Sequence, residues 1–293
     1  MNTQEQIEIA CNPANPVNYL ACCGIFDLLS RMDSAALGHW ETPSPIRFTL
    51  RTVVSEADLG ATIVRGLCSP QSWRFIAPTD SKEVVGVEVS FTPAASTTFS
   101  VAMDWWYETL KPDSKIDEKS SWKMWAGNQT VKQILEERLI PGCDVLRQAG
   151  KTSSLQSLLD ASYPLRGRFG FDPYSSINAL DLGWSPNDLG VPAPTRPFAE
   201  ILASMGAASF FPSRTGRPDD FGSTRGWHQR TKREQGFHYV LWNRPIPVTL
   251  ARWAALRPQH AEARGFFAAR VKSRGEYANL ISAKPSTIRG NTQ

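Results

Sequence analysis

The sequence predicts an α+β protein, with a body of mixed helices and antiparallel strands followed by a basic, mainly helical C-terminal part. Three observations support this fold class. Apolar residues recur at helical spacing in several segments, they alternate with polar residues in others, and two alternating segments flank a short turn at residues 93–98. The 293 residues are 41% apolar, enough for two modest domains or one large domain with a sizeable core.

The first helix is predicted over residues 16–32. Asn15 suits the N-cap, and Pro16 suits the first helical position, where the missing N–H costs nothing. The apolar residues that follow form more than one stripe, so this helix is expected to be buried on most sides. Gly24 lies inside the helix and indicates that another backbone crosses closely there.

Period-two alternation predicts three strands, over residues 48–54, 85–91 and 99–105. The last two are expected to form a hairpin. Between the first two strands, residues 55–67 are predicted to be a helix, with Ser55 as its cap and Leu59, Ile63 and Leu67 on one face. The first hundred residues are therefore expected to run helix, strand, helix, strand, strand.

Further helices are predicted in the middle of the chain, over residues 131–148, 153–161 and 196–209. Pro197 is well placed to open the last of them. Residues 164–194 are rich in Gly, Pro, Asp and Asn, and we expect a long ordered loop there.

A linker is predicted over residues 210–236, where Gly, Pro, Ser, Thr and Arg dominate. We therefore divide the chain into an α+β body, residues 1–212, and a C-terminal part, residues 213–293, that begins with a basic loop. In this C-terminal part we expect a strand over residues 237–242 and two helices over residues 248–256 and 259–274.

Charge is distributed unevenly along the chain. Residues 214–293 hold 15 Lys and Arg against 5 Asp and Glu, a balance of +10, whereas residues 1–213 hold 17 against 23, a balance of −6. An acidic body with a basic last quarter predicts a polyanionic partner.

The sequence also indicates the cellular compartment in which the protein is expected to work. No run of about 18 apolar residues occurs, so no membrane span is predicted. The polar, acidic N-terminus lacks the basic and apolar regions of a signal peptide. Five cysteines without a Cys-x-x-Cys pair are typical of reduced, mostly buried thiols, so we expect a cytoplasmic protein.

Motifs for catalysis or cofactor binding are weak. The run Gly150, Lys151, Thr152 lacks the upstream glycine of a phosphate-binding loop and is expected to follow the end of a helix. Cys22 and Cys23 are expected to be packed core thiols. The four histidines are scattered without metal-ligand spacing. We therefore predict no catalytic residue, no metal site and no cofactor.

The strongest functional signal is a basic segment of the C-terminal part with interleaved aromatic residues. Cations neutralise phosphates and release condensed counterions, and the Trp227 indole could stack on an unpaired base. The predicted phosphate contacts are Arg214, Arg217, Arg225, Arg230, Lys232 and Arg233. A solvated face with ordinary salt bridges is the alternative, but acidic residues are scarce there.

Two shorter clusters extend this prediction into the body. Arg166 and Arg168 form a second group of arginines beside aromatic residues. Asn128 and Gln129 are weaker candidates for base-edge contacts, which amides make with adenine in the major groove. A neighbouring indole, Trp125, could be a stacking platform, although the same polar cluster could simply cap a helix.

Two functions from other classes remain open. A general acid–base ribonuclease could be built from His228, His238 and Lys232, which lie close together in the basic segment. A protein-only scaffold could instead use the basic face to meet an acidic partner.

Several segments resemble a CRISPR-associated family. The segments are residues 12–28 (NPANPVNYLACCGIFDL), 166–173 (RGRFGFDP), 179–187 (ALDLGWSPN), 198–207 (FAEILASMGA) and 239–243 (YVLWN). The first two are specific, and the others are generic. Together they are similar to the small, large-subunit-like component of the Cascade effector complex of CRISPR subtype I-U, also called I-G.

This resemblance implies a non-catalytic subunit of an RNA-guided surveillance complex. Such subunits sit at one end of a guide-RNA-bound filament of other CRISPR effector subunits. They engage the short motif that flanks the target in double-stranded DNA, help to open the duplex, and present a surface to the helicase–nuclease. Sequence is read by guide–target pairing, so the protein senses only the flanking motif, shape and phosphates. The chain is small for such a large subunit.

Overall fold

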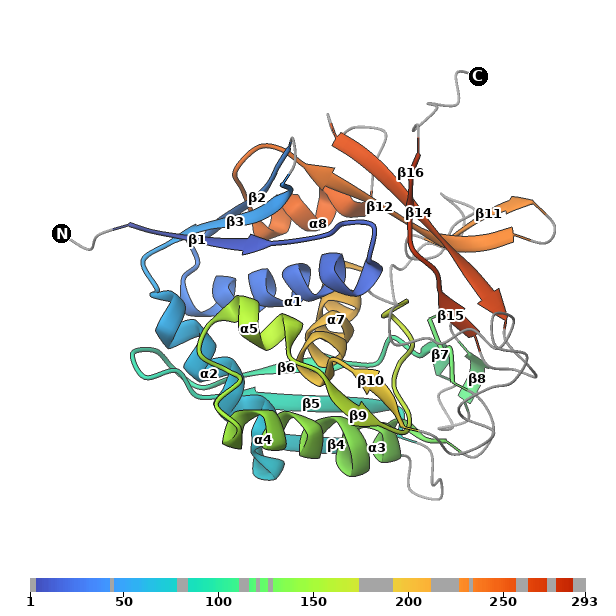
Figure 1. The fold of residues 1–293 in the computed structure, drawn as a ribbon, viewed down its shortest axis with the longest axis horizontal. Coiled ribbons are helices and arrows are strands. Elements are labelled where there is room, and N and C mark those ends of the chain that lie inside the picture. The colour runs from blue at the N-terminus through green and yellow to red at the C-terminus, as the bar shows by residue number, and fades with distance from the viewer. Residues whose placement is uncertain are drawn as a thin grey trace.

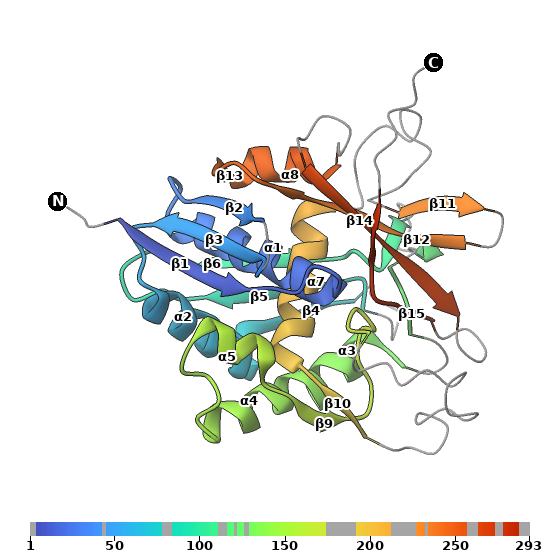
Figure 2. The ribbon, with the colours of Figure 1, turned by 45° about the horizontal axis from the view of Figure 1, so that its top comes forward.

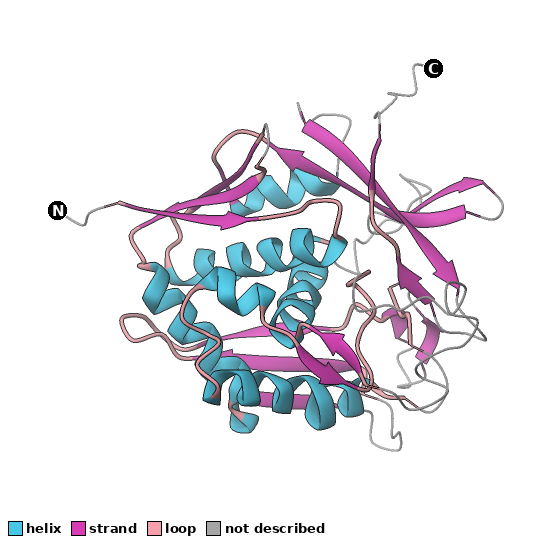
Figure 3. Ribbon diagram, viewed as in Figure 1, coloured by secondary structure: helices cyan, strands magenta, loops and turns pink. Residues whose placement is uncertain are grey.

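The computed structural model describes residues 4–42, 45–77, 84–110, 116–119, 122–125, 129–173, 192–211, 227–231, 234–256, 263–272 and 278–286. It confirms the predicted α+β class, because helices and antiparallel sheets share one molecule (Figure 3). The boundary predicted between residues 212 and 213 lies just after the end of a buried helix, at the start of a stretch outside these ranges.

One antiparallel sheet forms the upper layer in Figure 1. Its order is β1(Glu5–Ala10), β3(Arg47–Thr52), β2(Leu37–Glu41) and β13(Ile246–Pro247). All strand pairings in this sheet are antiparallel. In the β1–β3 pair, Ile7 lies opposite Leu50. The predicted strand over residues 48–54 is thus confirmed as β3, whereas β1 and β2 were not predicted.

Two helices fill the centre of the molecule. α1(Pro16–Met32) and α7(Pro197–Phe210) cross each other between the upper sheet and a second antiparallel sheet, β4(Trp73–Ile76), β5(Gly86–Phe91) and β6(Phe99–Met103) (Figures 1 and 2). A Cβ atom added to Gly24 would lie 2.1 Å from the Leu202 carbonyl oxygen, and one added to Gly206 would lie 1.9 Å from the Leu20 oxygen. The predicted close backbone crossing at Gly24 is confirmed.

Local capping explains where the predicted helices begin. The Asn15 side chain accepts a hydrogen bond from the Val17 amide at the start of α1, and Ser55 accepts from the Asp58 amide at the start of α2(Glu56–Cys68). Both caps match the predictions. The α1 residues from Pro16 to Leu29 are buried except Asn18, as the wide apolar stripe predicted.

A group of helices covers the flank beside β5. It consists of α2, α3(Val131–Ile134), η2(Leu135–Leu139), α4(Ile140–Gln148) and α5(Leu155–Asp160), with the short η1(Pro70–Ser72) before β4. The helix predicted over residues 131–148 is confirmed as the continuous run α3, η2 and α4. It ends as expected at Gly150, where φ is +68° and the Gly150 and Lys151 amides donate to the Arg147 and Leu146 carbonyls.

The C-terminal part is mainly strand in the residues that the structure describes, which corrects the mainly helical prediction. A third sheet contains β11(Trp227–Thr231), β12(Glu234–Trp242), β14(Ala263–Lys272), β15(Ala278–Leu280) and β16(Lys284–Ser286). Two predictions are confirmed, the strand over residues 237–242 within β12 and the helix α8(Val248–Leu256). The helix predicted over residues 259–274 is wrong.

The helix prediction failed here because tertiary contacts, not local propensity, decide the conformation of this segment. The Ala and Arg residues of β14 favour helix locally, but pairing with β12 buries Phe266 and Ala268 on alternate positions. Phe266 then stacks on Tyr239 at 5.8 Å between ring centroids. Burial against a partner strand outweighs the small differences in helix propensity.

One hydrophobic core joins both predicted parts of the chain. Trp242 of β12 lies 6.0 Å from Phe48 and 6.1 Å from Phe210 between ring centroids. Trp105, Trp106, Trp122 and Trp125 are all buried. Trp105 is therefore a core residue, as predicted, and Trp125 is not an exposed stacking platform.

Buried thiols and helix lengths complete the description. Cys22 and Cys23 are fully buried, and burial raises the pKa of both thiols, which confirms them as core residues. None of the helices in the described ranges combines the length and apolarity needed to cross a membrane.

Candidate nucleic-acid interface

The loop after β9(Tyr163–Leu165) is the centre of the candidate site. It carries residues 166–173, one of the two segments that specify the family resemblance. Gly167 and Gly170 have φ of +93° and +89°, a conformation that glycine adopts without strain. The two turns bury Phe169 and Phe171 in the aromatic core beside Trp105. Arg166 is left exposed on the outer side.

A buried carboxylate holds this loop from the inside. Glu200 of α7 accepts hydrogen bonds from the Phe169 and Asp172 amides, both at 3.2 Å. Burial raises the pKa of Glu200 to about 7, with a further increase from the nearby Asp172 carboxylate, while Arg168 and the two amide donors oppose the shift. The loop is therefore fixed through its backbone to the central helix.

A second set of contacts ties the loop to the start of α1. Asn15 Nδ2 donates to Asp172 Oδ1 at 2.9 Å, and Arg196 Nε donates to Asp172 Oδ2 at 2.7 Å. Arg196 also donates to Asn18 Oδ1 at 2.9 Å. The structure thus bonds together the segments 12–28 and 166–173, which are 157 positions apart at the Asn15–Asp172 contact.

Arg168 occupies a different environment from Arg166. Its side chain is half-buried near Glu200 and Asp172, and burial lowers its pKa, while the two carboxylates act in the opposite direction. Its charge therefore interacts with these two buried carboxylates. A phosphate contact at Arg168 stays a prediction, and it has less structural support than the one at Arg166.

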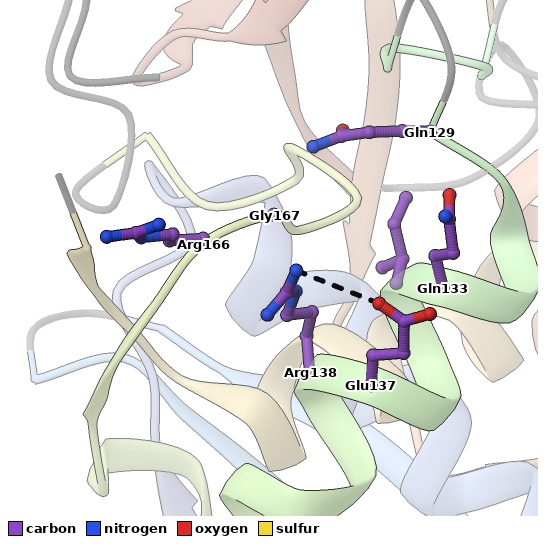
Figure 4. Close-up of a pocket in the computed structure, with 7 residues that line it drawn as sticks. Gln129, Gln133, Glu137, Arg138, Arg166 and Gly167 are labelled. Carbon is purple, nitrogen blue, oxygen red and sulfur yellow. Dashed lines mark ion pairs between the residues drawn. The ribbon is translucent and has the colours of Figure 1, made fainter. Parts of the chain in front are cut away.

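A pocket of about 290 Å³ opens between this loop and the helical run α3–η2 (Figure 4). Its lining residues are Gln129, Gln133, Ile134, Glu137, Arg138, Arg166 and Gly167. In Figure 4, Gln133, Glu137 and Arg138 rise from the helical run, Gln129 lies across from them beside the loop, and Arg166 extends away from the helix. Two of the residues predicted from sequence, Gln129 and Arg166, therefore meet at one pocket.

The helical wall of the pocket has an unusual backbone. Pro141 lacks the N–H that would bond the Glu137 carbonyl, and the preceding turn widens into the π-helical η2, in which the Ile140 amide donates to the Leu135 carbonyl. Such one-turn bulges are frequent at functional sites. Here the bulge carries Glu137 and Arg138, two residues that line the pocket.

The polar side chains of the pocket differ in whether they already have a hydrogen-bond or ion-pair partner. Gln133 completes a capping box, because its Oε1 accepts from the Thr130 amide at 3.1 Å. Arg138 Nη2 lies 3.7 Å from Glu137 Oε2. In the part of the chain that the structure describes, the Gln129 amide has no hydrogen-bond partner and Arg166 has no ion-pair partner. Of the two alternatives for this amide cluster, the helix cap is confirmed, because Thr130 caps α3. A base-edge contact by Gln129 stays a prediction.

The other predicted contacts cannot be placed at this pocket. Trp227 and Arg230 lie on β11, whose backbone alone is described. Five more residues lie outside the described ranges, as does the other predicted amide: Arg214, Arg217, Arg225, Lys232, Arg233 and Asn128.

Sequence reasoning did not single out Gln133, Glu137 or Arg138. The sequence does carry a signal for them, because Pro141, eleven residues after the Thr130 cap and inside a helical pattern, marks an irregular turn. That signal locates the turn but not its neighbour, the loop at Gly167. Only the tertiary fold brings the two together.

No family model, no curated protein and no solved structure matches this chain. The family resemblance therefore rests on the sequence segments themselves.

Proposed function

We propose that the chain is a non-catalytic subunit of an RNA-guided CRISPR type I surveillance complex, of subtype I-U or I-G. It engages target DNA and its flanking motif and helps to recruit the helicase–nuclease. Its partners are the guide-RNA ribonucleoprotein, the other CRISPR effector subunits and target double-stranded DNA, and the complex works in the cytoplasm. The sequence resemblance and the basic last quarter of the chain support this proposal.

The observation that carries most weight is the pocket at the Gly167 loop. It presents Arg166 and the Gln129 amide, neither of which has a partner in the described structure, next to a polar helical wall. The contacts of Asp172 and Glu200 brace the loop from inside. A cation on a braced loop, with an amide on the facing side of the same pocket, suits contacts to phosphate and base edge better than it suits a merely solvated face.

Reconstitution tests the proposal directly. The backbone subunits and guide RNA are assembled with and without this chain, and binding to target duplex DNA is measured over a salt series. We expect omission of the chain to abolish duplex binding while the RNA-bound filament stays intact. Equal duplex binding without the chain would exclude a DNA-engaging role and favour the protein-only scaffold.

A charge variant tests the predicted contacts of the basic segment. Replacing Arg214, Arg217 and Arg225 by alanine removes three cations. DNA affinity should fall, and the slope of log K against log salt should flatten by about 0.9 per lost phosphate contact. A matched control replaces Arg47, Arg74 and Arg147, which are surface arginines paired with Glu8, Glu88 and Asp144. Equal effects in the two variants would contradict the site assignment.

A guide-RNA-processing endoribonuclease is the second candidate, favoured by one backbone observation. The β11–β12 register places His228 opposite Gly236, two positions before His238. Two histidines at neighbouring positions of a hairpin could serve as general acid and base. In that case His228→Ala abolishes cleavage of a repeat hairpin but leaves RNA binding intact, and absence of cleavage by the wild-type chain removes this candidate.

A further inference from the structure

We propose that the pocket beside η2 receives one unpaired guanine, read by Glu137 and Gln129, with the adjoining phosphate at Arg166. This inference deepens the proposed function and rests on it for the class of ligand, a nucleic acid. It adds the strandedness of that ligand and the base that is preferred.

The size of the pocket limits the ligand to a single nucleotide. Its volume of about 290 Å³ lies just below the range of small-molecule sites, which is about 300–1,000 Å³. A base pair does not fit into such a space. Proteins that read a single base do so on its hydrogen-bonding edges after it has left the stack.

The polar groups of the wall match the Watson–Crick edge of guanine. Guanine presents two adjacent donors, N1–H and the N2 amino group, next to the acceptor O6. The Glu137 carboxylate has two oxygens that can accept from both donors, and the Gln129 amide can donate to O6. Carboxylates accept hydrogen bonds only, so they favour an edge that carries adjacent donors.

The other bases fit this arrangement less well. Adenine and cytosine each present one amino donor next to a ring-nitrogen acceptor, which would face a carboxylate oxygen. Thymine has a single N–H between two carbonyl acceptors. A buried or half-buried acceptor facing another acceptor costs free energy because neither is satisfied.

The groups that read the base are free to turn toward it. The Arg138–Glu137 separation of 3.7 Å is longer than the roughly 2.7–2.9 Å of a charge-assisted hydrogen bond. The two side chains are 43% and 51% exposed, and exposed ion pairs of this kind contribute little to stability. The pocket also has a net positive balance of +1, from Arg138 and Arg166 against Glu137. A phosphate is therefore attracted despite the carboxylate.

Gly167 keeps the opposite wall open. Its φ of +93° disfavours any residue with a side chain, and a Cβ atom there would lie 3.5 Å from Gln129 Nε2. A Cβ atom at this position would thus be in van der Waals contact with the amide that is expected to donate to O6, and the positive φ is what favours glycine. Ile134, which is almost completely buried, supplies an apolar floor.

The test measures the binding of short oligonucleotides to the full-length chain. Fluorescein-labelled pentadeoxynucleotides carry one guanine, adenine, cytosine or thymine at the centre of four thymines, and binding is followed by anisotropy at low salt. We expect the guanine probe to bind more tightly by roughly 5- to 150-fold, the range of one good bidentate base contact. Equal affinity for all four probes, or no binding of any probe, overturns the proposal.

Two variants and one control separate base reading from phosphate binding. Glu137→Gln should remove the guanine preference while the thymine probe binds as before. The control is Glu136→Gln, one position away on η2, where the carboxylate pairs with Lys132 at 3.5 Å and does not line the pocket. Arg166→Gln should weaken all four probes alike and lower the salt slope by about one. Loss of preference in the Glu136 variant, or retention of it in the Glu137 variant, overturns the assignment.

The outcome is distinguishable from failure of the proposed function. If the reconstituted complex requires this chain for duplex binding but the probes show no base preference, the subunit role stands and the guanine pocket does not. If the probes show the preference but the complex binds duplex DNA without the chain, the pocket stands and the subunit role does not.

Discussion

The crossing of α1 and α7 makes Gly206→Ala a sharp test of the fold. The Cβ atom would lie 1.9 Å from the Leu20 carbonyl oxygen and 2.9 Å from the Gly24 amide nitrogen. Both neighbours are backbone atoms of a helix that is buried along most of its length. No side chain can rotate to make room, so the two helices have to separate.

The expected loss of stability follows from two opposing effects. Overpacking of a core costs about 1–3 kcal/mol where side chains can adjust, and contact between two backbones belongs at or above the upper end. Alanine regains about 1 kcal/mol over glycine in a helix interior. We therefore expect a net loss of about 2 kcal/mol or more in the free energy of unfolding, which is roughly a 30-fold change in the folded-to-unfolded ratio.

Urea unfolding followed by tryptophan fluorescence and far-UV circular dichroism measures this change. The matched control is Gly60→Ala in α2, where an added Cβ has no neighbour within 4 Å. That variant should gain about 0.5–1 kcal/mol, because alanine is the better helix former. The reasoning is refuted if the Gly206 variant is as stable as the wild type, or if both variants lose stability equally.

Two further predictions concern the network beneath the candidate site. Asp172→Asn leaves Arg196 with a buried, uncompensated charge and should cost about 3–5 kcal/mol in urea unfolding; a loss below about 1 kcal/mol would show that the pair is not important for stability. Glu200 has a folded-state pKa of about 7 against an ordinary value of 4.5, so the folded state binds more protons between these values. Its contribution to stability is therefore complete below pH 4.5 and is lost as pH rises through about 7. Glu200→Gln should flatten this fall in a series of unfolding curves, and an identical pH profile in both proteins would contradict the assignment.

Local signals accounted for the helices that were predicted correctly. Asn15 with Pro16, and Ser55 with its apolar face, act within a few residues of the chain, so the sequence alone locates α1 and α2. Gly24 was informative for a different reason. A glycine inside an apolar helix costs stability unless a second backbone requires the space, and α7 provides that backbone.

Strands at sheet edges and ends were harder to predict because their burial depends on distant partners. β2 contains Gly38, His39 and Trp40 and has no regular alternation. It becomes a strand by pairing with β3 on one side and β13 on the other, and β13 lies about two hundred positions later in the chain. β14 was mistaken for a helix for the same reason, since β12 decides its conformation.

The candidate site was predicted in part. Gln129 and Arg166 were singled out from residue chemistry, and they lie at the same pocket. Arg168 was chosen by the same reasoning, but it is half-buried near Glu200 and Asp172. The two arginines are only two positions apart, yet Arg166 is exposed and Arg168 is half-buried. On an irregular loop, residue type and spacing do not determine this difference in burial.

By itself, the sequence determined the α+β class, the caps that begin the main helices, the close helix crossing at Gly24 and the basic character of the last quarter. These properties depend on local backbone preferences, on spacing along the chain, or on composition. Only the tertiary structure decided that β14 is a strand, that Asn15 bonds Asp172, and that the η2 bulge faces the Gly167 loop. Those outcomes depend on free energy gained between residues far apart in the chain, where burial and hydrogen bonding outweigh local propensity.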